Sequence, residues 1–195
     1  KAGEEDKLRG LYQETLYGIN NIQAILEDTD HRLWLGSIAN GVQPFMQVSE
    51  EVWLKPVTPY LDSDTLGNDV IKAVYQDRFG QIWVGTYGNG LLCISEKTFA
   101  QYQLGSDSSR NNIHAVFQDD NKDFWFGTDD GLFFVDNYSA NSFGGVYTLS
   151  GVIPLRSNRV YTKADGLPSN QITSVVQDDQ GKIWVGTKES GVAFL

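Results

Sequence analysis

Apolar and polar residues alternate in short runs along the chain, and the same alternation returns four times. In the first run, Ile22, Ala24 and Leu26 fall on one face of an extended chain, and Gln23 and Ile25 fall on the other. A period of two in segments rich in β-branched and aromatic residues is typical of β-strands. The pattern predicts an all-β chain, with no helix of more than two turns inside a repeat.

Each repeat is centred on one tryptophan: Trp34, Trp83, Trp125 and Trp184. An Ile lies 12 residues before each Trp, an Asp lies six before it, and a Gly lies two after it. These partners are Asp28, Asp77, Asp119 and Asp178, with Gly36, Gly85, Gly127 and Gly186. Successive Trp residues are 49, 42 and 59 apart. The units therefore keep their interior and vary in their connections, and we interpret these repeated residues as structural.

The strand that carries each Trp is apolar on both faces, so its sheet needs cover on both sides. Small four-stranded sheets packed around an axis, as in a β-propeller, provide that cover. A solenoid is the alternative fold, but 42–59 residues per unit is long for a β-helix coil. The Gly after each Trp would let a neighbouring chain approach closely. An Asp turn precedes the Trp strand, and Gly80 and Gly181 occupy a turn position where His31 and Lys122 stand in the other two repeats.

We assign residues 1–195 to one propeller domain. The repeat cores are predicted at about 19–45, 68–94, 110–135 and 169–195, with atypical inserts at 46–66 and 136–160. An outer strand at residues 8–15 could close a four-bladed ring by completing the last repeat. The other interpretation, which we favour, is that the repeats form part of a larger propeller. Trp53 lies outside the pattern, and we expect it to be more exposed than the other four.

Composition narrows the classes of function. Hydrophobic residues make up 41% of the 195 and charged residues 21%, which is typical of a globular chain. A net charge of −10 disfavours binding to nucleic acid or to anionic lipid. No apolar run approaches the roughly 18 residues of a membrane-spanning helix. Cys93 is the only cysteine, and we expect it to fill a small space in the core.

No motif for catalysis or cofactor binding is present. The chain lacks a P-loop, Gly-x-Gly-x-x-Gly, His-Glu-x-x-His, Cys-x-x-Cys and Gly-x-Ser-x-Gly. His31 is placed in a turn and His114 in a strand, and both are expected to be surface residues. The acidic pairs Asp129/Asp130 and Asp62/Asp64 lack the twelve-residue loop with a closing Glu that calcium sites of this type use. We therefore predict no catalytic residue, no metal and no cofactor.

The repeat consensus resembles that of the two-component regulator propeller family. The match is carried by Trp83-Val-Gly-Thr86, by Trp184-Val-Gly-Thr187 and by the lead-in from Tyr161 to Asn170. The resemblance implies the extracytoplasmic, periplasmic sensor region of a bacterial inner-membrane signalling receptor. It also implies an output module, a histidine kinase or a diguanylate cyclase, and further propeller blades in the parent protein. Many family members are thought to sense carbohydrate fragments.

Residues that differ between repeats are the candidates for binding. In an antiparallel meander alternate turns share an edge, so the Asp turns lie on one face of the propeller. The loops after each Trp strand and the lead-ins before each Ile lie on the other face. Polar and aromatic residues of that face are Asn20, Asn21, Tyr87, Asn89, Asn111, Asn112, Asp129, Asp130, Lys188 and Glu189.

From this set we select as ligand-binding candidates Tyr87, Asn89, Asn112, Asp129, Asp130, Lys188 and Glu189. Amide, carboxylate and aromatic groups suit the hydroxyls and rings of a small molecule or oligosaccharide. We predict a non-catalytic sensor, and a dimer is compatible with this assignment. A propeller enzyme, either a lyase or a hydrolase, and a protein-interaction scaffold are the alternatives.

Overall fold

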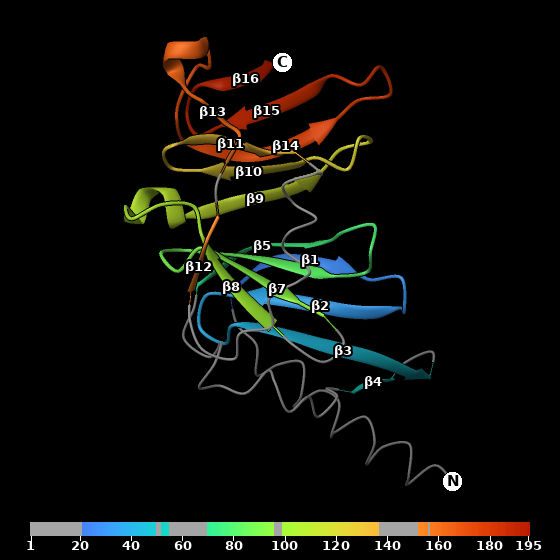
Figure 1. Cartoon of the computed structure of the whole chain (residues 1–195). Coiled ribbons are helices and arrows are strands. Elements are labelled where there is room, and N and C mark those ends of the chain that lie inside the picture. The colour runs from blue at the N-terminus through green and yellow to red at the C-terminus, as the bar shows by residue number, and fades with distance from the viewer. Residues whose placement is uncertain (1–20, 50–51, 55–69, 96–98, 137–151, 156) are drawn as a thin grey trace, which may run out of the picture. The chain divides into compact units, whose positions relative to one another are not determined.

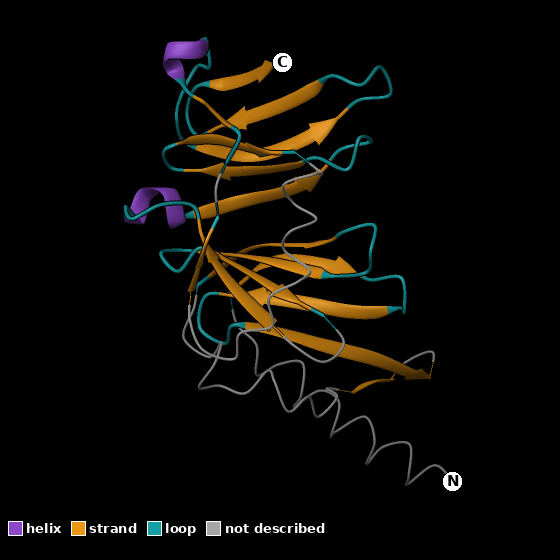
Figure 2. Ribbon diagram, in the orientation of Figure 1, coloured by secondary structure: helices purple, strands orange, loops and turns teal. Residues whose placement is uncertain are grey.

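The computed structural model describes residues 21–49, 52–54, 70–95, 99–136, 152–155 and 157–195 (Figure 1). The chain divides into two compact units, Lys1–Ile71 and Lys72–Leu195, each of which is described by itself. Strands dominate the described part, and its helical elements are two single 3-10 turns (Figure 2). Neither turn is long and apolar enough to cross a membrane. For the described residues, the prediction of an all-β fold with no helix of more than two turns inside a repeat is confirmed.

The first unit contains one antiparallel sheet in the order β1-β2-β3-β4. Its strands are β1 (Ile22–Glu27), β2 (Arg32–Ser37), β3 (Val42–Ser49) and β4 (Val52–Leu54). In β1 the side chains alternate between half-buried and exposed, as the period of two predicted. The outer strands β3 and β4 lie partly in the segment 46–66, which the sequence marked as atypical. Trp53 lies in β4, but its side chain lies outside the described part of the structure, so the prediction of its exposure stays a prediction. The predicted outer strand at residues 8–15 also lies outside the described residues.

Three sheets make up the second unit. The first has the order β12-β8-β7-β6-β5, the second β13-β11-β10-β9 and the third β14-β15-β16. The first sheet contains β5 (Ile71–Gln76), β6 (Ile82–Thr86), β7 (Leu91–Ile94), β8 (Phe99–Gln103) and β12 (Val152–Pro154). The second contains β9 (Ile113–Gln118), β10 (Phe124–Thr128), β11 (Gly131–Val135) and β13 (Arg159–Tyr161). The third contains β14 (Ile172–Gln177), β15 (Ile183–Thr187) and β16 (Gly191–Phe194). The 3-10 turns are η1 (Ser108–Asn111) and η3 (Lys163–Asp165).

Strand counts depart from the predicted four in two of the sheets. The sheet of β5–β8 gains β12, which pairs with β8 in parallel, although the sequence predicted an antiparallel meander. β12 belongs to the insert at 136–160, and the next residue, Leu155, is 5% exposed in the core of this unit. Burial of apolar residues from the insert accounts for the extra strand. The sheet of β14–β16 has three strands in the described part of the chain.

The fixed distance between Asp and Trp has a direct structural cause. In each repeat one carboxylate oxygen of the Asp accepts a hydrogen bond from the indole Nε1–H of the Trp six residues later, at 2.7–2.9 Å. The other oxygen accepts from two backbone N–H groups of the turn, for example those of Phe79 and Gln81 at Asp77. One side chain thus shapes the turn and satisfies the buried polar atom of the Trp.

At two junctions the Gly after the Trp gives room for the next repeat. A Cβ built on Gly85 would lie 2.9 Å from the carbonyl oxygen and from Cγ2 of Ile113, and one on Gly127 would lie 2.8 Å from Cγ2 of Ile172. No real Cβ has such contacts, so the fixed Ile of one repeat packs directly against the fixed Gly of the repeat before it. This contact confirms the predicted close approach and identifies the approaching residue.

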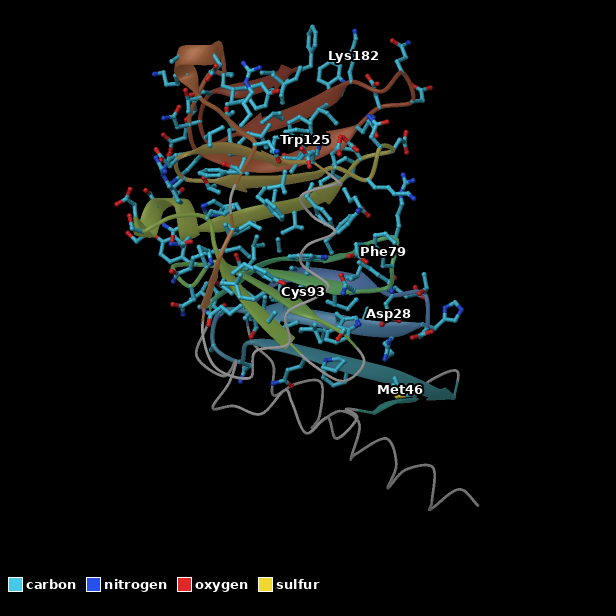
Figure 3. All side chains as sticks on the ribbon, in the orientation of Figure 1. Asp28, Met46, Phe79, Cys93, Trp125 and Lys182 are labelled. Atoms are coloured by element: carbon cyan, nitrogen blue, oxygen red, sulfur yellow. The ribbon has the colours of Figure 1, made fainter. Side chains whose placement is uncertain are left out.

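Two of the Trp side chains, Trp83 and Trp125, fill spaces between the sheets of the second unit. Trp83 is 1% exposed, and its ring lies 5.0 Å from that of Phe124 in the next sheet. Trp125 packs in a cluster with Ile172, Ile183 and other residues of the β14–β16 sheet (Figure 3). In the first unit Trp34 is 4% exposed. The prediction of burial is confirmed for these three.

Trp184 is different, and the prediction of burial between two sheets is wrong for it. Its indole is only half-buried, and it packs against Phe194 of its own sheet at 5.3 Å. Val176 and Phe194, which flank it, are 55% and 57% exposed. This face of the β14–β16 sheet is apolar and is not covered by another sheet in the described part of the chain.

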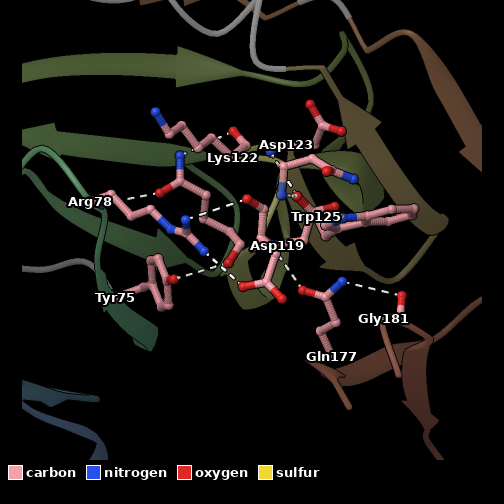
Figure 4. A network of polar contacts seen from close by, with 11 residues as sticks. Tyr75, Arg78, Asp119, Lys122, Asp123, Trp125, Gln177 and Gly181 are labelled. Carbon is pink, nitrogen blue, oxygen red and sulfur yellow. Dashed lines mark hydrogen bonds and ion pairs between the residues drawn. The ribbon is translucent and has the colours of Figure 1, made fainter. Parts of the chain in front are cut away.

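Neighbouring sheets are also joined at the Asp turns (Figure 4). The Oε1 atom of Gln118 accepts a hydrogen bond from the backbone N–H of Arg78 in the preceding repeat, and its Nε2 donates to the carbonyl of Lys122 in its own turn. Gln177 makes the same two contacts, to Asp120 and to Gly181. An ion pair of 2.9 Å between Arg78 and Asp120 adds to the first junction. Gln118 and Gln177, each the residue before the repeated Asp, therefore link their sheet to the sheet of the preceding repeat.

Candidate functional site

The loops after the Trp strands have a common anchor and different tips. In each repeat the hydroxyl that follows the Trp by three residues donates to the carbonyl of the Gly that closes the loop. The donors are Ser37, Thr86, Thr128 and Thr187. The next position holds Ile38, Tyr87, Asp129 and Lys188 in turn. The fold fixes the base of each loop and leaves the tip free to vary.

The loop of the second repeat and the lead-in of the third lie side by side. The backbone N–H groups of Gly88 and Gly90 both donate to the carbonyl of Asn111, at 3.2 and 3.1 Å. Tyr87 and Asn112 form an isolated antiparallel bridge. Two of the segments that the sequence placed on one face are therefore in direct contact.

A polar cluster forms at this junction from Tyr87, Asn112, His114 and Asp129. One oxygen of the Asp129 carboxylate accepts from Nδ2 of Asn112 at 2.8 Å, and the other lies 2.9 Å from Nε2 of His114. The imidazole ring lies 6.3 Å from the Tyr87 ring, at an interplanar angle of 59°. Tyr87 is 52% exposed, whereas the side chains of His114 and Asp129 are each 21% exposed. The cluster is a rigid polar surface with an open aromatic ring.

The contact of His114 with a loop of the binding face was not predicted. The sequence placed this residue in a strand, at the surface. The strand assignment is correct, since His114 is the second residue of β9, but its side chain reaches the loop that holds Asp129. A signal was available, because the repeats carry Gln23, Lys72 and Thr173 at this position, so it varies as the loop tips do.

Two other face residues, Asp130 and Asn111, have structural contacts. Nε of Arg110 lies 2.9 Å from the carboxylate of Asp130, so this acid is already paired. Asn111 is 3% exposed, and its side chain bonds the backbone of Leu104, Gly105 and Asp107. Asn111 therefore stabilises its own loop, and its buried side chain is not accessible to a ligand.

The remaining candidates are not members of the cluster, although Asn89 shares its loop with Tyr87. Asn89 is exposed in the loop between β6 and β7, and its carbonyl accepts from Gln101. Lys188 and Glu189 are exposed in the loop between β15 and β16, where Glu189 has a φ of 63°. Asn21 also has a positive φ, 58°, which suits a turn. Asn20 lies outside the described residues.

Of the other chemically reactive side chains, His31 has a local partner and Cys93 is buried. His31 is exposed in its turn, and its hydrogen bond to Glu27 raises the pKa of the imidazole. Burial raises the pKa of the Cys93 thiol, so the thiol stays protonated and acts as a core residue, as predicted. Within the described ranges no three His, Cys, Asp or Glu side chains come together as metal ligands. Asp62 and Asp64 lie outside those ranges.

The family model of the two-component regulator propeller matches residues 17–39, 65–88, 107–130 and 166–189. Each match contains one of the four Trp residues and the loop that follows it. The chain carries two-component regulator propeller repeats. In these repeats the Asp–Trp hydrogen bond and the Ile–Gly contact explain why the matched segments keep their spacing.

The chain is also similar in sequence to the histidine kinase P4 of Formosa agariphila, with 25% identity over 163 residues. That alignment covers 81% of this chain and 11% of the relative. Among solved structures, the extracellular domain named as a hybrid two-component system of B. thetaiotaomicron superposes with a TM-score of 0.67 at 22% identity, over 90% of this chain and 24% of that one. A second such domain from that organism gives 0.60 at 20% identity, over 90% and 21%.

The likeness extends to propellers outside signalling proteins. Virginiamycin B lyase from Staphylococcus aureus superposes with a TM-score of 0.56 at 12% identity, over 89% of this chain and 55% of the lyase. At these levels of identity the superpositions show the fold alone. They establish that the sheets are propeller blades, and that the chain spans about a quarter or less of the signalling structures it matches.

Proposed function

We propose that this chain is part of the sensor propeller of a bacterial membrane signalling receptor. The proposal is supported by the regulator propeller repeats, by the similarity to a histidine kinase and by the superposition on extracellular domains named as hybrid two-component systems. The sensor lies on the extracytoplasmic side, in the periplasm of a cell with an outer membrane. The output module is a histidine kinase, and this chain itself binds without catalysis.

The ligand face is the loop face, and the observation that carries this proposal is the cluster of Tyr87, Asn112, His114 and Asp129. A residue that a blade needs recurs in every repeat, but the position that Tyr87 and Asp129 share and the position of His114 each hold a different residue in all four repeats. Hydrogen bonds from Asn112 and His114 to Asp129 hold these three side chains in one arrangement, and Tyr87 pairs with Asn112 through a backbone bridge. An open aromatic ring beside fixed polar groups suits an oligosaccharide, whose rings have apolar faces and hydroxyl rims.

A pair of double variants tests the face. Tyr87→Ala with Asn89→Ala removes exposed groups of the loop face, whereas Gln81→Ala with Gln180→Ala removes side chains of the Asp turns. Binding is measured by thermal shift against a panel of oligosaccharides, and signalling in the intact receptor serves as a second readout. We expect the first variant to lose the response with its melting temperature unchanged. A response lost only in the Asp-turn variant would contradict the proposal.

We further propose that the apolar face around Trp184 receives another propeller blade in the parent protein. In the third repeat the equivalent face, formed by Trp125 with Phe117 and Phe134, packs against Ile183 and Val185 of the fourth. In the fourth repeat Trp184, Val176 and Phe194 occupy the same positions, and the last two are more than half exposed. A sheet with an Ile/Val face like that of β15 would complete the same contact.

A further inference from the structure

In the polar cluster of Tyr87, Asn112, His114 and Asp129, one side-chain atom, Nδ1 of His114, has a defined direction but no hydrogen-bond partner among the described residues. A carboxylate only accepts hydrogen bonds, so Nε2 of His114 carries the proton that it shares with Asp129. In the neutral ring Nδ1 is then an acceptor, and it has no partner among the described residues. Every buried side-chain nitrogen or oxygen in that part of the chain has a partner, so this Nδ1 is open to solvent.

Two neighbours keep the imidazole in place. Asp129 is held in turn by Nδ2 of Asn112, so the His114 ring is the end of a chain of two hydrogen bonds. The centroid of the Tyr87 ring lies 6.3 Å from that of the imidazole. Because the hydrogen bond to Asp129 orients the imidazole, its acceptor points in one direction before any ligand arrives, which lowers the entropy cost of binding.

We propose that His114 determines the specificity of this surface, by accepting a hydrogen bond from a hydroxyl of a neutral sugar whose ring stacks on Tyr87. Asp129 is a positioning residue that selects the tautomer, and Asn112 holds Asp129. The inference rests on the proposed ligand face and deepens it. It also accounts for the composition of the cluster, since the Asp129 carboxylate already accepts from two donors and its negative charge would repel an acidic ligand.

The arrangement is peculiar to one junction of the propeller. At the position of His114 the other repeats have Gln23, Lys72 and Thr173, and at the position of Asp129 they have Ile38, Tyr87 and Lys188. No other repeat combines an imidazole with a carboxylate at these positions. The blade does not require the pair, so its presence is best explained by what the surface binds.

The test is titration of the full chain with cellobiose, laminaribiose and maltose as neutral probes, and with digalacturonate as an acidic one. We expect a neutral disaccharide to bind more tightly than the acid. His114→Gln keeps a donor near Nε2 but lacks Nδ1, so the dissociation constant should rise roughly three- to tenfold, the effect of one hydrogen bond. Thr173→Ala, at the equivalent position of the fourth repeat, is the matched control and should bind as the parent does.

Nitrogen-15 spectra separate a contact with ligand from a purely structural role. The chain has two histidines, so His31 serves as an internal reference. The Nδ1 signal of His114 should shift when the disaccharide binds, and Asp129→Leu should change the tautomer and weaken binding together. Loss of binding in Tyr87→Ala without an effect of His114→Gln, or an unshifted Nδ1 signal, would overturn the inference and leave the ligand face intact. No binding of any probe would overturn both.

Discussion

At the scale of single residues, the Asp turn requires a left-handed backbone conformation at its fourth residue. The fourth residue of this turn has a φ of 59° at His31, 79° at Gly80, 70° at Lys122 and 85° at Gly181. Glycine adopts this left-handed conformation freely, whereas other residues lose roughly 1–2 kcal/mol there. Two repeats therefore carry a strained residue in a turn whose hydrogen bonds to Asp hold it in shape.

This strain leads to the first prediction. Lys122→Gly should stabilise the chain by about 0.5–1 kcal/mol, because relief of the left-handed conformation exceeds the entropy that glycine loses on folding. The carbonyl of residue 122 still accepts from Gln118, since the backbone is unchanged. Urea unfolding of the variant and the parent gives the difference. A midpoint lower than that of the parent would show that the Lys side chain makes a contribution that outweighs the strain.

At the scale of elements, the strands could be predicted and some of their partners could not. The period of two and the fixed offsets predict the strands that carry Trp. These segments are apolar on both faces, so each has to lie in a sheet that is covered on both sides. The spacing of six between Asp and Trp revealed a constraint, but a one-dimensional pattern does not give side-chain direction. The indole bond and the reach of His114 to Asp129 are therefore visible only in three dimensions. The strand β12 was missed because its burial depends on a partner in another repeat.

The difference between two Trp residues gives a prediction at this scale. Trp83→Ala should cost about 3–5 kcal/mol, since it empties a space between two sheets and leaves the Asp77 carboxylate without its indole partner. Trp184→Ala should cost less than half of that, because its ring is half-buried and already meets solvent. Chemical denaturation of both variants checks the order. Equal losses would mean that the face around Trp184 is as well covered as that around Trp83.

At the scale of the whole molecule, stability should depend on pH through Asp28 and Asp178. Burial alone would raise the pKa of Asp28, but hydrogen bonds from Trp34 and Arg32 outweigh it and lower the pKa. The hydrogen bond from Trp184 lowers the pKa of Asp178. A carboxyl with a lowered pKa in the folded state stabilises fully above its unfolded value, about 3.9, and less as the pH falls through the folded pKa. Asp178→Asn should therefore be less stable than the parent at pH 7, and the gap should narrow below about pH 4. Melting curves from pH 7 to pH 3 measure the gap, and a constant gap would contradict this linkage.

The proposed contact of another blade with the face around Trp184 gives a prediction for the parent protein. Val176 and Phe194 are more than half exposed, so replacing both by Ser removes little buried area from this chain and should shift its melting temperature by only a degree or two. If another blade packs on this face, the same change in the parent protein introduces two polar groups into a contact like that of Trp125. The parent should then lose several kcal/mol of stability, as large core truncations do. Phe117→Ser with Phe134→Ser is the matched change at the covered face, and it should destabilise this chain as strongly as the first change destabilises the parent. Equal tolerance of the Val176 and Phe194 changes in both proteins would mean that no blade covers this face.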